Sequence, residues 1–269
     1  DFPPEVRIIA LGDDYQDWLA NDHSAELPTT CGEDPAWILF TSGSTGRPKG
    51  AVLSHRSLLA GLRSAALARP VNADDKYYYP FPLFHVAAHN VLLQHQYGAA
   101  VVLARSFDAA DTLRACRELQ VTAMSLAPTM IAMLLDHPDF TPTDLRSVRT
   151  IGYGASAMPQ TLLQRLLAES DVGLCQSYGM TELSGSVAFL TPEDHRMAAG
   201  DTPQLLNSVG RPVPTAQIKL IDDEGRPCPF GAPGEILVHA PQCMEGYWND
   251  DTATALAMAN GWLHTGDIG

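Results

Sequence analysis

The feature that most constrains the fold is an alternation of short β-like runs with amphipathic, helix-like stretches between residues 6 and 177. Strands that alternate with helices form parallel sheets, because each crossover returns the chain to the same end of the sheet. We therefore predict an α/β fold with a largely parallel, helix-covered sheet. The expected strands cover residues 6–11, 36–40, 76–79, 99–103, 122–126, 148–153 and 172–176. The expected helices cover residues 58–67, 91–97, 109–119, 130–135 and 162–167.

The pattern changes after residue 191. Prolines now separate shorter β-like runs, at residues 217–221 and 235–239, and the Asp-Asp-Glu-Gly run at 222–225 is typical of a turn between them. A smaller, mostly antiparallel β region is expected here. We therefore predict an α/β core over residues 1–200 and a β-rich subdomain over residues 201–269, packed together.

The composition indicates a globular protein and excludes several partners. The chain has 269 residues, of which 45% are hydrophobic and 18% charged, enough for a substantial core. No apolar run reaches the ~20 residues that span a bilayer. The net charge of −14 argues against nucleic acid as the main partner. The five cysteines form no Cys-x-x-Cys pair, which argues against zinc and favours reduced thiols in the cytoplasm. No pattern indicates an oligomeric state.

The segment from Thr41 to Gly50, TSGSTGRPKG, has the chemistry of an anion-binding loop. Its glycines allow several backbone N–H groups to turn toward one anion, while its hydroxyls and Lys49 add donors and positive charge. A flexible Gly/Ser linker is the alternative, but Pro48 and Lys49 interrupt the run. A Walker A loop requires Gly-Lys-Ser/Thr, which this segment lacks. We expect the loop to bind a polyphosphate.

The order of residues in this loop resembles the phosphate loop of the adenylate-forming superfamily. That group includes acyl-CoA synthetases, firefly-type luciferases and peptide-synthetase adenylation domains. Four further segments resemble the superfamily in the same order: PLFHV at 82–86, GYGASAMP at 152–159, QSYGMTE at 176–182 and WLHTGD at 262–267. The LTPEDH run at 190–195, with the YGAS run at 153–156, resembles the bacterial fatty-acyl-CoA ligase branch. One departure is Ser156-Ala157, where many relatives have Ala-Pro.

The resemblance implies a site for ATP and Mg²⁺. Tyr178 would stack on adenine, Thr181 would donate to the α-phosphate, Glu182 would bind the metal and Asp267 would accept from the ribose. Mg²⁺ takes one or two protein carboxylates and leaves its other positions to phosphates and water. The implied nucleotide-binding residues are Thr41, Ser42, Gly43, Ser44, Thr45, Gly46, Lys49, Gly154, Ala155, Ser156, Gln176, Ser177, Tyr178, Gly179, Met180, Thr181 and Asp267.

The resemblance also implies an acyl pocket and a catalytic set. The pocket residues, whose small to medium size suits an alkyl or aryl acid, are His85, Val86, His89, Ala127, Met130, Ile131, Gly152, Gly154 and Met180. No Asp occurs between His85 and Arg105 to hold a substrate ammonium, so an amino-acid substrate is disfavoured. The implied catalytic residues are Thr181, Glu182, Lys49 and His85. Taken alone, His85 fits a packed core histidine better than a catalytic one.

The function implied by the resemblance is ATP-dependent activation of a carboxylic acid, expected to be a fatty acid, to acyl-AMP. Transfer to coenzyme A would follow. One alternative is an acyl-AMP ligase that loads a carrier-protein phosphopantetheine, and another is a non-catalytic nucleotide-binding module. A luciferase-like oxygenase shares the adenylation step, but no residue here requires oxygen chemistry.

The resemblance further implies that the chain is part of the large N-terminal domain, without the mobile C-terminal domain and its lysine. Losing one transition-state donor commonly lowers the rate by ~10²–10³. We therefore expect the 269 residues to bind nucleotide and acid but to catalyse poorly.

Overall fold

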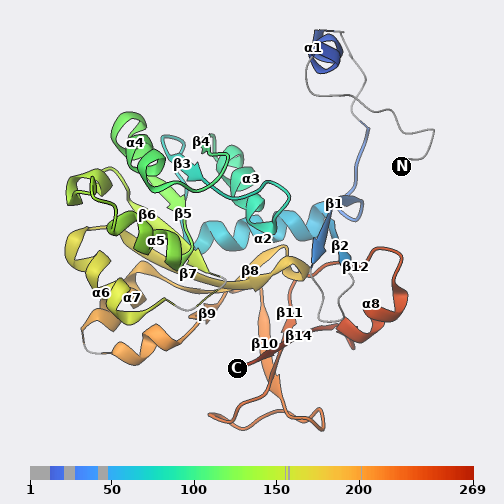
Figure 1. The fold of residues 1–269 in the computed structure, drawn as a ribbon. Helices are drawn as coiled ribbons and strands as arrows, with labels where there is room; N and C mark the ends of the chain where they lie inside the picture. Colours follow the sequence, from blue (N-terminus) through green and yellow to red (C-terminus); the bar gives the residue numbers. More distant parts are fainter. Residues whose placement is uncertain (1–12, 21–27, 42–47, 155, 157, 201) are drawn as a thin grey trace. The chain divides into compact units, whose positions relative to one another are not determined.

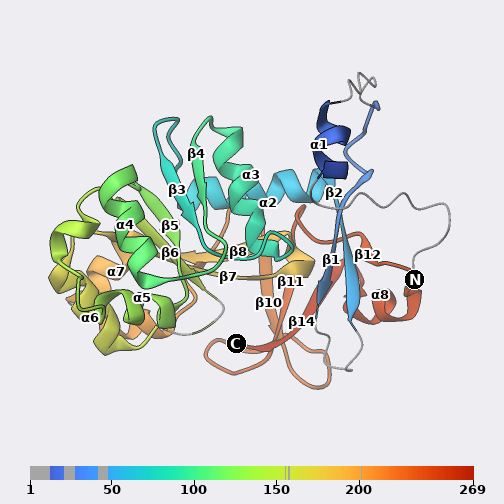
Figure 2. The same cartoon turned by 45° about the horizontal axis from the view of Figure 1, so that its top comes forward.

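The computed structural model describes residues 13–20, 28–41, 48–154, 156, 158–200 and 202–269. The chain divides into two compact units, residues 1–31 and residues 32–269. In the first unit the structure describes one helix, α1 (Asp13–Ala20). The strand expected at residues 6–11 lies outside the described residues. The second unit contains the sheets in Figures 1 and 2.

A seven-stranded sheet forms the centre of the second unit, in the order β4-β3-β5-β6-β7-β8-β9. Neighbours from β4 to β7 are parallel, whereas β8 and β9 are antiparallel. This arrangement confirms the predicted α/β class with a largely parallel sheet. The strands are β3 (Lys76–Tyr79), β4 (Ala100–Leu103), β5 (Ala123–Ser125), β6 (Thr150–Gly154), β7 (Gly173–Met180), β8 (Gly185–Leu190) and β9 (Arg211–Pro212).

Helices cover both faces of this sheet, as Figures 1 and 2 show. Because side chains alternate along a strand, neighbouring residues face opposite helices. Tyr77 packs in a cluster with α3, whereas Tyr78 packs in a cluster with α4, α5 and α6. On the α3 face, Cys175 packs against α2. The helices are α2 (His55–Ala68), α3 (His89–Gln96), α4 (Ala109–Leu119), α5 (Pro128–Leu135) and α6 (Gln160–Glu169).

The predicted smaller antiparallel region is a four-stranded sheet, in the order β10-β11-β14-β13. Its first two strands have the predicted bounds, and the predicted turn at 222–225 begins the connection between them. Gly225 N–H donates to Asp222 O at 2.9 Å, and Gly225 has a φ of +76°, which glycine adopts readily. The strands are β10 (Gln217–Ile221), β11 (Glu235–His239), β13 (Met258–Ala259) and β14 (Trp262–Ile268).

One predicted strand lies in a different sheet from the one expected. The apolar run at 36–40 belongs to β1 (Pro35–Thr41), which pairs antiparallel with β2 (Lys49–Ser54). β12 (Gly246–Tyr247) adds a third strand next to β2. The physical reason is connection length, because parallel neighbours need a crossover of about a dozen residues or more. Only residues 42–48 separate β1 from β2, so a hairpin forms.

Backbone pairing joins the regions on either side of residue 200. β9 pairs with β8, and β12 pairs with β2. The domain boundary near residue 200 stays a prediction.

Among the described residues, no helix has the length and apolarity needed to cross a membrane. The other helical elements are η1 (Val86–Ala88), η2 (Pro142–Leu145), η3 (Thr181–Leu183), α7 (Pro192–Ala199), η4 (Pro203–Asn207) and α8 (Asp251–Ala257).

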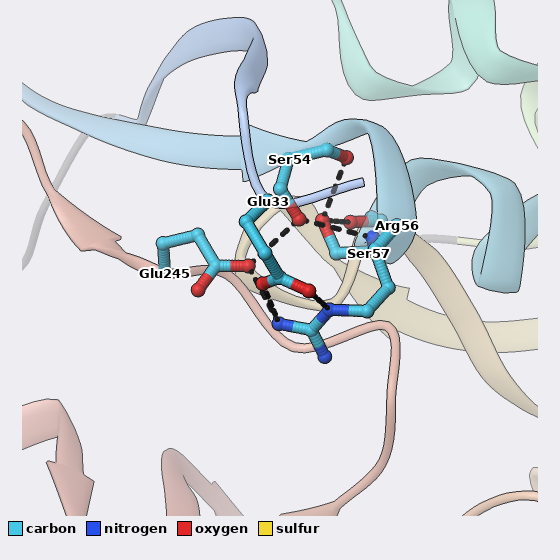
Figure 3. Close-up of polar contacts among 6 residues, drawn as sticks. Glu33, Ser54, Arg56, Ser57 and Glu245 are labelled. Carbon is cyan, nitrogen blue, oxygen red and sulfur yellow. Dashed lines mark hydrogen bonds and ion pairs between the residues drawn. The ribbon is translucent and has the colours of Figure 1, made fainter. Parts of the chain in front are cut away.

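A polar cluster ties the start of α2 to the loop before β12 (Figure 3). Ser54, which is fully buried, is the N-cap of α2, and its Oγ accepts from Ser57 N–H at 3.1 Å. The same hydroxyl donates to Glu245 Oε1 at 2.7 Å. Arg56 donates to both carboxylate oxygens of Glu33 at 2.8 Å and to Glu245 at 3.1 Å. The cluster thus positions two elements that reach the candidate site.

We expect Ser54→Ala to lower the free energy of unfolding by roughly 1–2 kcal/mol. The substitution removes the helix cap and the hydroxyl that donates to Glu245. Urea denaturation measures the change. Ser106→Ala, at an exposed serine, is the matched control and should stay within about 0.5 kcal/mol of the wild type. Equal losses in the two variants would contradict this assignment.

Candidate functional site

A cavity of about 700 Å³ lies against the face of the large sheet that α2 and α3 cover. Its volume is in the range of about 300–1,000 Å³ that small-molecule sites occupy. Two side-by-side pairs of strand positions contribute to it from the sheet, Ser125 with Gly152 and Gly154 with Ser177. Glycines at two of these positions leave room over β6. The sheet face and the two helices therefore form a pocket suited to a small molecule.

The cavity brings together predicted site residues from segments that are far apart in the sequence. Segments that contribute include the end of β1, the start of β2, η1, β6, β7 and η3. Their meeting at one wall supports a single site, while their individual roles stay predictions. The predicted residues on the wall are Thr41, Lys49, His85, Val86, His89, Ala127, Gly152, Gly154, Ser177, Gly179, Met180, Thr181 and Glu182.

Two predicted pocket residues, Met130 and Ile131, do not line the cavity. Both lie on α5, and Ile131 is fully buried in the cluster with α4 and α6 on the opposite sheet face. This corrects the expected pocket. Gln176 and Ser156 are also absent from the described wall. Six predicted nucleotide-binding residues lie outside the described residues: Ser42, Gly43, Ser44, Thr45, Gly46 and Ala155.

The two residues expected to bind the nucleoside are hydrogen-bonded to each other beside the cavity. Tyr178 donates its hydroxyl to Asp267 Oδ2 at 2.7 Å. Their chain neighbours Gly179 and Gly266 line the cavity. The pKa of Tyr178 is raised to about 12, mainly by burial and next by the Asp267 carboxylate. Tyr178 is therefore neutral at pH 7, with its hydroxyl proton directed to Asp267.

Glu182 is a buried carboxylate on the cavity wall, with an exposed fraction of 5%. Tyr247 donates its hydroxyl to Glu182 Oε1 at 2.8 Å, and burial followed by Glu182 raises the pKa of Tyr247. The Tyr247 ring centroid lies 5.2 Å from Lys49 Nζ. Tyr247 thus links the predicted metal ligand to the predicted phosphate lysine. The sequence analysis assigned Tyr247 no role.

The turn that carries Glu182 is held by Gln242, which sequence reasoning also missed. Gln242 is fully buried, and its Nε2 donates to Leu183 O at 2.8 Å and to Ser186 O at 2.9 Å. Its Oε1 accepts from Ser64 Oγ of α2 at 2.8 Å. These bonds attach the β7–β8 connection to α2. No local sequence pattern could have revealed them, because the partners are 56 or more residues away.

Both histidines on the cavity wall are neutral at pH 7. His89 is buried, and its neutral ring donates from Nδ1 to Val86 O at 2.8 Å. The pKa of His89 is lowered to about 4, chiefly by burial and to a smaller extent by the nearby Arg69. Burial also lowers the pKa of His85, whose Nδ1 accepts from Ala87 N–H at 3.1 Å. The wall therefore presents neutral imidazoles to a bound acid.

The described donor set fits Mg²⁺ that arrives with a nucleotide. Among the residues the structure describes, no group of three or more His, Cys, Asp or Glu side chains could hold a metal. Mg²⁺ needs only one or two protein carboxylates when phosphates and water complete its shell. Glu182, a buried oxygen donor on the cavity wall, satisfies that requirement.

We expect His89→Gln to flatten the dependence of stability on pH below about pH 6.5. A histidine with a folded pKa near 4 and an unfolded pKa of about 6.5 contributes stability above pH 6.5. That contribution, up to roughly 3 kcal/mol, is lost as the pH falls toward 4, because only the unfolded chain takes up the proton. Urea unfolding between about pH 7 and about pH 4.5 measures it.

The control for this measurement is His95→Gln, an exposed histidine on the same helix. It should keep the slope of the wild type. If the stability of the wild type depended on pH as weakly as that of His89→Gln, the folded state would not be excluding the proton from His89.

Comparison with known proteins identifies the family. Residues 4–248 match the AMP-binding enzyme family. The chain is 34% identical to an indoleacetate–CoA ligase of Aromatoleum aromaticum over 98% of its length and 52% of that protein. It is also 34% identical to a fatty acid–[acyl-carrier-protein] ligase, ScoC of Streptomyces coeruleorubidus, over 99% of this chain and 52% of that one. The chain thus spans about half the length of these relatives.

A solved structure shows the same fold. The inhibitor-bound N-terminal domain of FACL13 from Mycobacterium tuberculosis superposes with a TM-score of 0.86 at 30% identity. The match covers 96% of this chain and 63% of that one. The resemblance read from the phosphate loop and its four companion segments is confirmed. The chain belongs to the AMP-binding enzyme family.

Proposed function

We propose that this chain binds Mg·ATP and a carboxylic acid in one cavity, as part of an enzyme that forms acyl-AMP and then an acyl thioester. The observation that carries the proposal is the meeting of Lys49, Thr181 and Glu182 on one wall. The hydrogen-bonded Tyr178 and Asp267 lie beside them. Membership in the AMP-binding enzyme family supports the same reading.

The nucleoside is proposed to bind at the Tyr178–Asp267 pair. The Tyr178 ring offers a flat face for adenine, and base–aromatic stacking contributes roughly 1–3 kcal/mol. Tyr178 bonds to only one oxygen of Asp267, so the other carboxylate oxygen can accept from the ribose hydroxyls. The phosphates then extend toward Thr181 and Lys49, where a hydroxyl and an ammonium are available.

Glu182 is proposed to hold Mg²⁺, which neutralises phosphate charge when bound. Tyr247 occupies one oxygen of the Glu182 carboxylate. Among the described side chains, no other donor bonds to its second oxygen, which leaves that oxygen for a cation. Because Gln242 fixes the adjoining turn, the carboxylate is held in place before the ligand binds.

In the proposed reaction an oxygen of the acid attacks the α-phosphorus of ATP, and pyrophosphate leaves with the electron pair of the broken P–O bond. The protein contributes mainly positioning and charge neutralisation. His85 is proposed to lie beside the reacting carboxylate. Since its pKa is lowered, it acts there as a neutral hydrogen-bonding group and not as a cation.

The thiol acceptor is proposed to be coenzyme A, with a carrier-protein phosphopantetheine as the second candidate. Two relatives of equal identity divide on this point, since one is named a CoA ligase and the other an acyl-carrier-protein ligase. Product analysis with each acceptor separates the two. The substrate proposed from the sequence is a fatty acid.

We expect Glu182→Gln to weaken Mg·ATP binding about tenfold while leaving metal-free ATP binding unchanged. The amide keeps the size of the side chain but lacks the charge that holds the cation. Calorimetric titration with Mg·ATP, and with ATP in EDTA, measures both affinities. Glu118→Gln, at an exposed residue of α4, is the control and should match the wild type. Unchanged Mg·ATP affinity in Glu182→Gln would exclude the metal role.

A further inference from the structure

The cavity contains a cation that the proposed reaction does not use. Arg69 is the C-cap residue of α2, and it lines the cavity together with Asn90 and Ser125. It lies outside the segments expected to bind the nucleotide. A guanidinium in a substrate cavity is a strong constraint on what the cavity can bind, because it stays charged at any physiological pH.

Arg69 lies over β6 at Gly152. Gly152 and Gly154 are two positions apart on β6, so they share one face and are separated by roughly 6–7 Å. Gly154 pairs with Ser177, near the strand ends that lead to the predicted nucleotide residues. A Cβ on Gly152 would lie 2.0 Å from Arg69 Nη1. The guanidinium therefore lies directly over Gly152, farther along β6 than Gly154 from the strand ends that lead to the predicted nucleotide residues.

Neutral partners hold the guanidinium in place. Arg69 Nη1 donates to Ser125 Oγ at 3.0 Å, and Nη2 donates to Asn90 Oδ1. Ser125 Oγ also accepts from Tyr77 at 2.8 Å, and Asn90 Nδ2 donates to Ala87 O at 3.0 Å. The partners are thus fixed themselves, so the orientation of the guanidinium is set before a ligand enters.

The charge of Arg69 lacks a counter-ion within the described part of the chain. None of the ion pairs formed by described residues includes Arg69. Arg149 shows the contrast, since its Nη2 lies 2.6 Å from a carboxylate oxygen of the buried Asp75. The two side-chain bonds of Arg69 use two of its five N–H donors. Donors and charge therefore remain for a ligand.

We propose that Arg69 selects a dicarboxylic acid, whose second carboxylate pairs with the guanidinium while the first is activated at the Thr181 end. This inference rests on the proposed function. A guanidinium matches a carboxylate through two parallel hydrogen bonds, and an unpaired charge away from water is unfavourable. An unsubstituted fatty acid would place its methyl end against this cation. Arg69 is thus a specificity residue, and the favoured acid differs from the fatty acid expected from the sequence.

The test compares acids of equal chain length by calorimetric titration in the presence of a non-hydrolysable Mg·ATP analogue. The probes are straight-chain diacids from hexanedioate to dodecanedioate, each paired with its monocarboxylate and its terminal methyl-ketone acid. In the wild type, we expect the diacid of the best length to bind about 10- to 100-fold more tightly than its monocarboxylate. Arg69→Met should abolish that preference, and Arg69→Lys should keep part of it.

Arg63→Met is the matched control, because Arg63 is an exposed arginine on the same helix. It should preserve the preference for diacids. Urea midpoints and Mg·ATP affinities show whether each variant is folded. If Arg69→Met fails to fold, Arg69→Lys carries the test, because a folded Arg69→Lys with the full preference of the wild type would show that the guanidinium is not required.

The inference is overturned if no diacid binds, if monocarboxylates or oxo acids bind as tightly as diacids at every length, or if a folded Arg69→Met keeps the preference. If Mg·ATP binding is intact, any of these results rules out the role of Arg69 and leaves the proposed function standing. Failure of the wild type to bind Mg·ATP at all would instead remove the proposed function.

Discussion

The buried amide of Gln242 is the interaction on which the site depends most. Its Nε2 satisfies two backbone carbonyls of the β7–β8 connection, and its Oε1 accepts from Ser64 of α2. Leaving a buried polar group without its partner costs roughly 1–3 kcal/mol, so the three segments are held in one arrangement. Because Glu182 lies in that connection and Arg69 ends α2, one buried side chain relates the proposed metal ligand to the guanidinium over Gly152.

Side chains alternate along the strands of the large sheet, so one face packs against a core and the other faces the cavity. One face carries the apolar cluster with α4, α5 and α6, which includes Met124 and Ile151. The next residues in sequence, Ser125 and Gly152, face the cavity under α2 and α3. Small and polar residues are therefore tolerated on one face because the other supplies much of the buried apolar surface. The cavity and this core are built from the same strands, and Leu126 and Tyr153 contribute to both.

Sequence reasoning succeeded where local pattern determines structure. The strands at 76–79, 217–221 and 235–239 and the helix at 109–119 have the predicted bounds. It missed β2 (Lys49–Ser54), because the strand begins inside a segment read as loop. The site was predictable only where a motif marks it. Tyr247, Gln242 and Arg69 act through contacts with residues distant in sequence, and no spacing or composition signals such contacts. Met130 was misplaced because one sequence does not show which sheet face a helix covers.

A crystal structure of the chain with a non-hydrolysable acyl-adenylate analogue of a dicarboxylic acid tests the central claim most directly. The account predicts adenine against the Tyr178 ring and the ribose at Asp267. It also predicts an acyl chain that passes Gly154 and Gly152 and ends at the guanidinium of Arg69. An analogue bound outside this cavity, or with its nucleoside away from Tyr178 and Asp267, would contradict the account.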